Sequence, residues 1–382
     1  MIPFLCCMNH SRYLSPFILE DLTEKMVFLG GPRQCGKTTL ALSFLDPASE
    51  RNEGYLNWDI VKNRKALQNG ELPAKERIVL DEIHKYARWR NLVKGFYDEH
   101  KQNKQILVTG SARLDYYRKG GDSLHGRYHY FRLHPFSLGE LDSTFDVQQQ
   151  LLKFGGFPEP LFKHNERFHR RWQAERIARV VYEDLRDLEQ IKEISLVELL
   201  INSLPDRVGS PLSIKSLRED LQVAHYTIER WITALENMYM VFRIPSWRAK
   251  KIRAVKKEQK LYFWDWSQVI DTAARFENMV ASHLLKYCHF LQDTQGHKME
   301  LCFIRDTDLR EIDFVVIKDN SPLFAVECKT GEKQISPRIR YFRERTSIPK
   351  FYQVHLGTKN FGNDKTGRVL PFHRFCSELT LP

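Results

Sequence analysis

The sequence predicts a mixed α/β protein of several domains: a parallel-sheet domain comes first, a mostly helical region follows, and a second α/β domain comes last. Three observations predict this order. A glycine-rich loop joins an apolar run to a helix-forming stretch, further apolar runs end in polar side chains, and a hairpin with alternating charges lies late in the chain. At 382 residues the chain exceeds what one hydrophobic core supports, so two or three domains are expected.

The composition is that of globular domains, with 42% hydrophobic and 28% charged residues. No apolar run is long enough to cross a bilayer, and residues 2–8 read poorly as a signal peptide, so we expect a cytoplasmic protein without a membrane partner. The seven cysteines lack CxxC spacing, which favours reduced thiols over disulfides or a zinc site. The net charge of +11 favours an anionic partner such as DNA, although nucleotide-binding proteins can be basic without binding DNA.

Residues 31–38 read GPRQCGKT and follow the apolar run 26–29, which is the strand, glycine loop and helix order of a phosphate-binding P-loop. Backbone N–H groups of such a loop point at phosphates, and the following helix adds the positive end of its dipole. We expect Lys37 to reach the β and γ phosphates of ATP and the Thr38 hydroxyl to ligate Mg²⁺. The residues expected to bind the nucleotide are Gly31, Pro32, Arg33, Gln34, Cys35, Gly36, Lys37, Thr38 and Thr39.

A second buried strand is expected over residues 77–80 and ends in Asp81 and Glu82. Open α/β sheets place ligands at the carboxyl ends of their strands. Asp81 is therefore the expected Mg²⁺ partner, and Glu82 is expected to polarise the attacking water. An acidic pair after a strand can also be a solvated helix start, but its combination with the P-loop favours catalysis.

A third strand is expected over residues 105–108, before Thr109 and Ser111, and a fourth over residues 130–133, after Arg127. Together with the P-loop and Asp81, these segments resemble the prokaryotic AAA-type ATPases that carry a C-terminal DUF4143 region. The resemblance rests on residues 30–40, 57–59, 81–83, 109–112, 126–127 and 133–141, and it covers nearly the whole chain.

The resemblance implies an AAA-like domain in which Ser111, or Thr109, senses the γ phosphate. Arg127 is a candidate arginine finger that a homo-oligomer would supply to a neighbouring subunit, since a guanidinium stabilises phosphoryl charge. Arg127 can equally be a surface or sheet-capping arginine, and Arg132 is its competitor.

The middle region is expected to be mostly helical, with a break at residues 155–158. A capped helix over residues 211–221, a second helix over 226–235 and a strand over 238–244 give the order of a winged helix. In one interpretation DNA contacts this module and the cationic run 247–257 follows the phosphates; in the other, the module only packs and the run is a solvated face. The expected DNA contacts are Lys215, His225, Thr227 and Arg230.

The last region predicts a hairpin with strands over residues 310–317 and 323–329. The hairpin brings Asp313 close to Glu327 and Lys329, which share a face because side chains alternate along a strand. Two carboxylates for Mg²⁺ and a lysine to orient water are what phosphodiester cleavage needs. The set resembles the PD-(D/E)xK nuclease signature, with Ile312 in place of the usual proline, and Glu277 resembles its helix carboxylate. Glu327 and Lys329 can also be an ion pair on an ordinary sheet, and the fold does not guarantee cleavage.

We therefore expect an AAA-like P-loop ATPase domain over residues 12–145, a helical region with a winged helix over 146–268, and a restriction-endonuclease-like domain over 269–382. The expected function is Mg²⁺-dependent ATP hydrolysis used for DNA binding, remodelling or cleavage. One alternative is a nucleotide-gated switch whose nuclease-like domain only recognises a partner, and another is a structure-specific nuclease regulated by its P-loop. The expected catalytic residues are Glu82, Ser111, Arg127, Glu277, Asp313, Glu327 and Lys329, and the expected metal ligands are Thr38, Asp81, Asp313 and Glu327.

Overall fold

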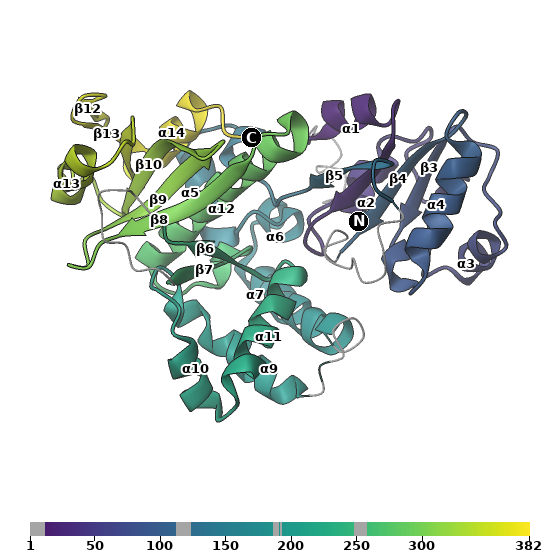
Figure 1. Ribbon diagram of the computed structural model, residues 1–382, viewed down its shortest axis with the longest axis horizontal. Coiled ribbons are helices and arrows are strands. Elements are labelled where there is room, and N and C mark those ends of the chain that lie inside the picture. Colours follow the sequence, from purple (N-terminus) through teal and green to yellow (C-terminus); the bar gives the residue numbers. More distant parts are fainter. Residues whose placement is uncertain (1–11, 112–123, 186–190, 192, 248–257) are drawn as a thin grey trace. The chain divides into compact units, whose positions relative to one another are not determined.

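The computed structural model describes residues 12–111, 124–185, 191, 193–247 and 258–382. Its contacts divide the chain into two compact units (Figure 1). Unit 1 comprises Met1–Pro135 and Asn237–Tyr239, and unit 2 comprises Phe136–Glu236 and Met240–Pro382. Across the described ranges, no helix has the length and apolar character that a bilayer crossing requires. The cysteines in these ranges form no disulfide with one another.

Unit 1 is built on a five-stranded sheet with the order β2-β3-β4-β1-β5, in which every neighbouring pair is parallel. The four strands expected from the sequence are present, each within two residues of its expected bounds, and a short additional strand, β2, lies at one edge. The strands are β1 Met26–Gly30, β2 Tyr55–Asn57, β3 Arg77–Asp81, β4 Gln105–Gly110 and β5 Tyr128–Arg132.

Helices cover both faces of this sheet, which explains why β1 is buried along its whole length. Alternate strand side chains, among them Phe28, Leu80 and Val108, form one core cluster with Leu67 of α3 and Val93 of α4. Fully burying one such large apolar side chain stabilises the fold by about 1.5–3 kcal/mol. The helices are α1 Ser15–Asp21, α2 Lys37–Leu42, α3 Val61–Gln68 and α4 Trp89–His100, with a short 3₁₀ turn, η2, over Ile83–Lys85.

The first half of unit 2 is mostly helical, as expected. The second of the two predicted helices, α11, buries Ile228, Trp231, Ile232 and Leu235, the side chains whose spacing predicted it. The first, α10, is capped by the Ser213 side chain, which accepts a 3.2 Å hydrogen bond from the backbone N–H of Ser216. The helices are α5 Phe145–Phe154, α6 Pro158–Lys163, α7 Glu166–Arg179, α9 Ile194–Ser203, α10 Ile214–Leu221 and α11 His225–Asn237, with a π-helical turn over Val180–Leu185 and 3₁₀ turns over Leu138–Glu140 and Pro205–Arg207.

An antiparallel strand pair, β6 Val241–Pro245 and β7 Gln259–Phe263, follows α11. Residues 248–257 of the predicted cationic run lie between these strands and outside the described residues. Trp247, at the start of the run, donates its backbone N–H to the carbonyl of Phe303, 2.6 Å away. The β6–β7 pair is thus joined to the sheet that follows it in the chain.

The second half of unit 2 is a six-stranded sheet with the order β12-β13-β11-β10-β9-β8. Strands β8, β9 and β10 form an antiparallel meander, and β11 continues the sheet parallel to β10. Helix α12 contacts the three meander strands, whereas Ile339 and Phe342 of α13 pack with Ile312 and Val315 in the core. The elements are a 3₁₀ turn over Trp266–Gln268, α12 Thr272–Gln295, β8 Met299–Arg305, β9 Glu311–Lys318, β10 Ser321–Lys329, α13 Pro337–Arg345, β11 Phe351–His355, β12 Phe361–Asn363, β13 Gly367–Pro371 and α14 Phe372–Glu378.

The predicted fold class is therefore confirmed: a parallel-sheet α/β domain comes first, a helical region follows, and a second α/β sheet comes last. The predicted boundaries at residues 145 and 268 stay predictions. The predicted third domain falls within unit 2, and so does the predicted second domain except for Asn237–Tyr239, which belong to unit 1.

Candidate functional site

The P-loop connects β1 to α2, as the sequence predicts, and its shape depends on its glycines. Gly31 and Gly36 have φ angles of 151° and 96°, which L side chains rarely adopt. A Cβ atom on Gly31 would also collide with the carbonyl oxygen of Leu133. The bend of the loop therefore requires glycine at both positions.

Lys37 is buried inside this loop rather than extended into solvent. Its Nζ donates hydrogen bonds to the carbonyl oxygens of Gly31, at 2.9 Å, and Pro32, at 2.7 Å. The loop thus holds the ammonium at its own centre. If a nucleotide binds, phosphate oxygens would replace these carbonyl oxygens as the partners of the Lys37 ammonium.

Asp81, at the end of β3, is buried and accepts hydrogen bonds from three hydroxyl groups. Thr38 donates to Oδ2 over 3.0 Å, Tyr55 donates to the same oxygen over 2.6 Å, and Thr109 donates to Oδ1. The sheet order explains this meeting: β4 lies between β1 and β3, so Thr109 lies opposite Asp81 in register. Thr38 and Asp81, the two expected Mg²⁺ ligands of this domain, are in direct contact.

Tyr55 belongs to this site, and the sequence reasoning missed it. Strand β2 has only three residues, too few to show an alternating pattern. Burial, and then the negative charge of Asp81, raise the pKa of Tyr55, so its hydroxyl remains a donor. Its position fixes the orientation of the Asp81 carboxylate.

Glu82 follows Asp81 in a left-handed backbone conformation, with φ 57°, which turns its side chain away from the strand direction. Its Oε2 lies 3.4 Å from Ser111 Oγ and 3.6 Å from Lys85 Nζ. Burial alone would raise the pKa of Glu82, but His84, Lys37, Lys85 and Arg33 together hold it below the usual value. An ionised carboxylate is the form that can accept a proton.

His84 was also missed by the sequence reasoning. It is buried with Nε2 3.8 Å from Glu82 Oε2, and neither ring nitrogen has a hydrogen-bond partner within the described part of the chain. Burial lowers the pKa of His84, against the opposing effect of the nearby Glu82 carboxylate. In the sequence His84 is simply the third residue after Asp81, and no motif or periodic spacing indicates that it belongs to the site.

The sequence left open whether Thr109 or Ser111 responds to the γ phosphate. In the structure the two hydroxyls serve different carboxylates, since Thr109 donates to Asp81 and Ser111 to Glu82. Both residues lie at the carboxyl edge of the sheet, where β1 leads into the P-loop. Ala112, part of the same predicted motif, lies outside the described residues.

Arg127 lies at the opposite, amino edge of the sheet. Its carbonyl accepts a hydrogen bond from the N–H of Met26, the first residue of β1, and its Nε lies 2.8 Å from Asp98 Oδ1 in α4. Arg127 is thus far along the strands from its own P-loop, and as an arginine finger it could act only on another copy. Its competitor, Arg132, ends β5 beside Gly30, at the edge that carries the P-loop.

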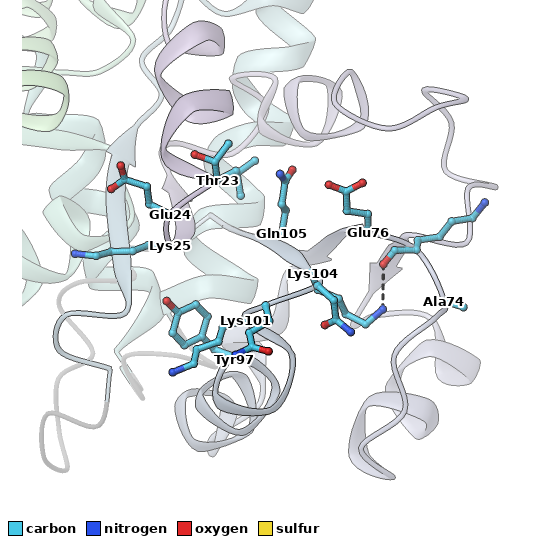
Figure 2. Close-up of a pocket in the computed structure, with 13 residues that line it drawn as sticks. Thr23, Glu24, Lys25, Ala74, Glu76, Tyr97, Lys101, Lys104 and Gln105 are labelled. Atoms are coloured by element: carbon cyan, nitrogen blue, oxygen red, sulfur yellow. Dashed lines mark hydrogen bonds between the residues drawn. The ribbon is translucent and has the colours of Figure 1, made fainter.

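A cavity of about 680 Å³ also lies at the amino edge of this sheet (Figure 2). Lys104, which lines it, donates hydrogen bonds from Nζ to the carbonyl oxygens of Pro73 and Lys75. The cavity is lined by Lys25, which precedes β1, by Glu76, which precedes β3, and by Gln105, which begins β4. It is therefore separated from the P-loop by the length of the strands.

The predicted DNA-contact residues lie on α10, on α11 and at their ends. Lys215, His225 and Arg230 are exposed, and Thr227 is partly buried. Tyr226, beside His225, is 76% exposed. The charge of the two helices is close to balanced, because three cations face four carboxylates: Lys215, Arg218 and Arg230 against Glu219, Asp220, Glu229 and Glu236.

In unit 2, the predicted carboxylates and lysine of the hairpin do meet. Strands β9 and β10 pair antiparallel with Phe314 opposite Val326, which brings Asp313 beside Glu327. Lys329 Nζ lies 2.6 Å from Glu327 Oε1, and the N–H of Cys328 donates to Asp313 Oδ2 over 2.7 Å. Burial, and then the charge of Asp313, raise the pKa of Glu327 to about 7, against the opposing effect of Lys329.

Glu277 comes to the same cluster from α12 but has different partners. Its Oε1 accepts hydrogen bonds from Tyr262 Oη, at 2.7 Å, and from Lys260 Nζ, at 3.2 Å. Burial, and then Asp313, raise the pKa of Glu277 to about 7. Lys260, Tyr262 and Glu311 were missed by the sequence reasoning, although the alternation of Lys260 and Tyr262 on β7 places both on one face.

One observation indicates that the hairpin residues could bind a metal ion, and it concerns the Oε2 atom of Glu327. Glu327 is fully buried, and its Oε2 has no hydrogen-bond partner among the described residues. Over the same residues, no group of three His, Cys, Asp or Glu side chains is placed to hold one metal ion. Asp313 and Glu327 could therefore supply two ligands, and other oxygen atoms would have to complete the shell.

Comparison with protein families divides the chain into three consecutive matches. An AAA domain of the AAA_14 family matches residues 23–142, a domain of unknown function, DUF8612, matches 146–275, and a second one, DUF4143, matches 273–375.

Similarity to individual proteins is more distant. Uncharacterized protein MJ1544 of Methanocaldococcus jannaschii is 20% identical, over 88% of this chain and 82% of its own length. Proteins Mb2031c of Mycobacterium bovis and Rv2008c of Mycobacterium tuberculosis are each 24% identical over 63% of this chain, which spans about half, 54%, of their length. The DNA clamp loader delta protein YqeN of Bacillus subtilis aligns over 58% of this chain and 87% of its own with 11% identity, and its TM-score of 0.28 is too low to indicate a shared overall fold.

Proposed function

Because this chain belongs to the proteins that join an AAA domain of the AAA_14 family to a DUF4143 domain, we propose that it binds and hydrolyses ATP and uses this cycle to act on DNA. The observation that carries the proposal is the hydrogen bond between Thr38 and Asp81 beside the P-loop. It joins the two side chains that hold Mg²⁺ in P-loop enzymes. When bound there, Mg²⁺ would neutralise charge on the β and γ phosphates.

Each protein group at this edge has a part in that reaction. Lys37 exchanges the carbonyls of Gly31 and Pro32 for phosphate oxygens and neutralises their charge. Glu82, whose pKa is held low, orients a water molecule and accepts its proton. Tyr55 and Thr109 keep Asp81 in one orientation, so that no reorganisation is needed during the reaction.

ATP binding is tested by calorimetric titration of the wild type and Lys37→Ala with ATP and Mg²⁺. The wild type is expected to bind, and Lys37→Ala is expected to bind at least tenfold more weakly, because it loses the ammonium that pairs with the phosphates. Lys62→Ala, which removes an exposed lysine of α3, is the matched control and should bind as the wild type does. Equal affinity of all three proteins would overturn the ATP site.

The action on DNA is supported by unit 2. Helices α10 and α11 followed by the β6–β7 pair have the order of a winged helix. The cluster of Asp313, Glu327 and Lys329 lies on β9 and β10, within the element order α12, β8–β10, α13 and β11. The net charge of +11 also favours a polyanionic partner. In this proposal ATP binding and hydrolysis move these parts between two arrangements.

The DNA part is tested on single-stranded, duplex and branched DNA with Mg²⁺, with and without ATP. We expect binding that weakens as salt rises, and any cleavage should be lost in Asp313→Asn while ATP turnover remains. Absence of both binding and cleavage on every substrate would overturn it.

A second function is favoured by one observation. The ammonium of Lys260 lies among the carboxylates of the cluster, 2.6 Å from Glu311 Oε1 and 3.2 Å from Glu277 Oε1. In this case the domain recognises a partner without cutting it, and the protein is a nucleotide-gated switch. ATP-dependent DNA binding without cleavage by the wild type would support this function, and cleavage that depends on Asp313 would exclude it.

A further inference from the structure

Lys260 of β7 has no exposed surface, yet it carries a charge into the interior of unit 2. Its Nζ lies 2.6 Å from Glu311 Oε1, 3.2 Å from Glu277 Oε1 and 3.9 Å from Asp313 Oδ1. A buried ammonium is costly unless carboxylates surround it. The three carboxylates around Lys260 compensate the charge of its ammonium.

The three carboxylates around Lys260 come from different elements, since Glu277 lies on α12 and the other two begin β9. Glu277 also accepts a hydrogen bond from Tyr262, which lies on the same face of β7 as Lys260. The β7 strand thus supplies both groups that satisfy Glu277. An ion that used Glu277 as a ligand would first have to displace an internal ammonium.

The other side of the cluster differs. Glu327 is fully buried, and its Oε1 is paired with Lys329 at 2.6 Å, with Arg338 farther away at 3.7 Å. Its Oε2 has no partner in the part of the chain that the structure describes. A buried carboxylate oxygen left without a partner is unfavourable, and a bound cation would satisfy it.

We propose that Lys260 is a built-in cation that takes the place of a divalent ion on the Glu277 and Glu311 side of the cluster, so that only the Asp313 and Glu327 side can accept a metal ion. Two-metal phosphodiester chemistry needs two ions about 3.5–4 Å apart, and the internal ammonium excludes the second. The domain is thereby restricted to one divalent ion. This inference concerns the cluster alone and does not depend on ATP binding in unit 1.

The test counts Mn²⁺ ions bound by the full chain without nucleotide, from the paramagnetic resonance signal of free Mn²⁺. Lys260→Met keeps an unbranched side chain, one atom shorter, and removes its charge. We expect this variant to bind one more Mn²⁺ than the wild type and to show a thermal midpoint that rises with Mn²⁺ concentration. Lys298→Met, which removes a lysine with a 62% exposed side chain, is the control and should match the wild type.

Lys260→Met leaves buried carboxylates without their partner, so a second variant guards against misfolding. The double variant Lys260→Met with Glu311→Gln removes one positive and one negative charge, and its net charge equals that of the wild type. We expect it to fold without Mn²⁺ and to bind the additional ion at least tenfold more weakly than Lys260→Met. If neither variant binds more Mn²⁺ than the wild type, or if the wild type already binds two ions that Asp313→Asn removes, the proposal is wrong.

Discussion

The hydroxyl of Thr38 donates a 3.0 Å hydrogen bond to Oδ2 of Asp81, although 43 positions separate the two residues in the sequence. The contact exists because α2 begins directly after the P-loop and β4 spaces β3 from β1 by one strand. Tyr55 donates to the same oxygen from the sheet edge. The candidate catalytic edge is therefore held together by hydroxyl groups that converge on one carboxylate.

Removal of the Tyr55 hydroxyl should loosen this edge. Tyr55→Phe deletes a 2.6 Å hydrogen bond to a buried carboxylate, and a hydrogen bond to a charged group contributes about 1.5–3 kcal/mol. We expect a loss of this size in the free energy of unfolding measured in urea, together with a higher Mg²⁺ concentration for half-maximal ATP turnover. Tyr97→Phe in α4, away from this edge, is the control. Unchanged stability and Mg²⁺ dependence in Tyr55→Phe would show that Asp81 does not need this donor.

Arg127 is proposed to act only on a neighbouring copy, because its own P-loop lies at the other edge of the sheet. Arg127→Ala and Glu82→Gln should then each hydrolyse ATP about 10³-fold more slowly, whereas a mixture of the two proteins should recover part of the rate. The recovery arises because some sites combine an intact Arg127 with an intact Glu82. Asp98→Asn, which keeps the arginine but removes the negative charge of its 2.8 Å partner, should remain active.

Two results would contradict a finger at Arg127. One is wild-type turnover by Arg127→Ala, and the other is failure of the mixture to regain any activity. In either case Arg132→Ala is the informative variant, since Arg132 lies beside Gly30 at the P-loop edge.

Acid should destabilise unit 2 through His283. This histidine is buried, its Nδ1 donates to the carbonyl of Met279 at 2.8 Å, and its Nε2 accepts the N–H of Leu138 at 3.2 Å. Burial lowers its pKa from 6.5 to about 3. In the unfolded chain His283 therefore binds a proton below pH 6.5, whereas in the folded chain it binds one only below about pH 3.

The stability that His283 contributes is thus complete above pH 6.5 and falls as the pH drops towards 3. Its share of the loss is expected to be about 1.4 kcal/mol per pH unit in this window. Urea unfolding between pH 7 and 4.5 of the wild type and His283→Gln should show a flatter dependence in the variant. His225→Gln, at an exposed histidine, is the control, and an equal slope in all three would show that His283 is not the titrating group.

Because carboxylates balance the cations of α10 and α11, we expect two phosphate contacts from this pair, made by Lys215 and Arg230. The double variant Lys215→Ala with Arg230→Ala should weaken DNA binding and reduce the slope of log affinity against log salt by about 1.8, if each side chain contacts one phosphate. Lys62→Ala with Lys298→Ala removes two exposed lysines elsewhere and should leave the slope unchanged. A slope unaltered by the first variant would assign the phosphate contacts to other parts of the chain.

Local sequence patterns predicted the parts of the fold that depend on neighbouring residues. The P-loop glycines, the apolar strands and the spacing of Ile228, Trp231 and Leu235 are properties of short segments, and each predicted its element. The pairing of Asp313 with Glu327 also followed from the hairpin, because a turn of few residues fixes the register.

Contacts between distant segments could not be predicted in the same way. Tyr55 reaches Asp81 from a strand of three residues, and Lys260 reaches Glu277 and Glu311 from a strand outside the predicted hairpin. Each of these contacts depends on the order of the strands in the sheet, and the spacing of residues within one segment does not predict that order. His84 was missed for another reason, since its burial beside Glu82 follows from a left-handed turn at Glu82 itself.

The central claim, that the edge formed by Thr38, Asp81 and Glu82 hydrolyses ATP, is tested most directly by single-turnover hydrolysis of radiolabelled ATP with Mg²⁺. Glu82→Gln keeps the shape of the side chain but cannot accept a proton, so it should bind ATP as the wild type does and cleave it about 10²–10⁴-fold more slowly. Glu53→Gln, at an exposed glutamate of the same unit, should cleave at the wild-type rate. A wild type that binds ATP without cleaving it, or a Glu82→Gln variant that cleaves at the wild-type rate, would contradict the account.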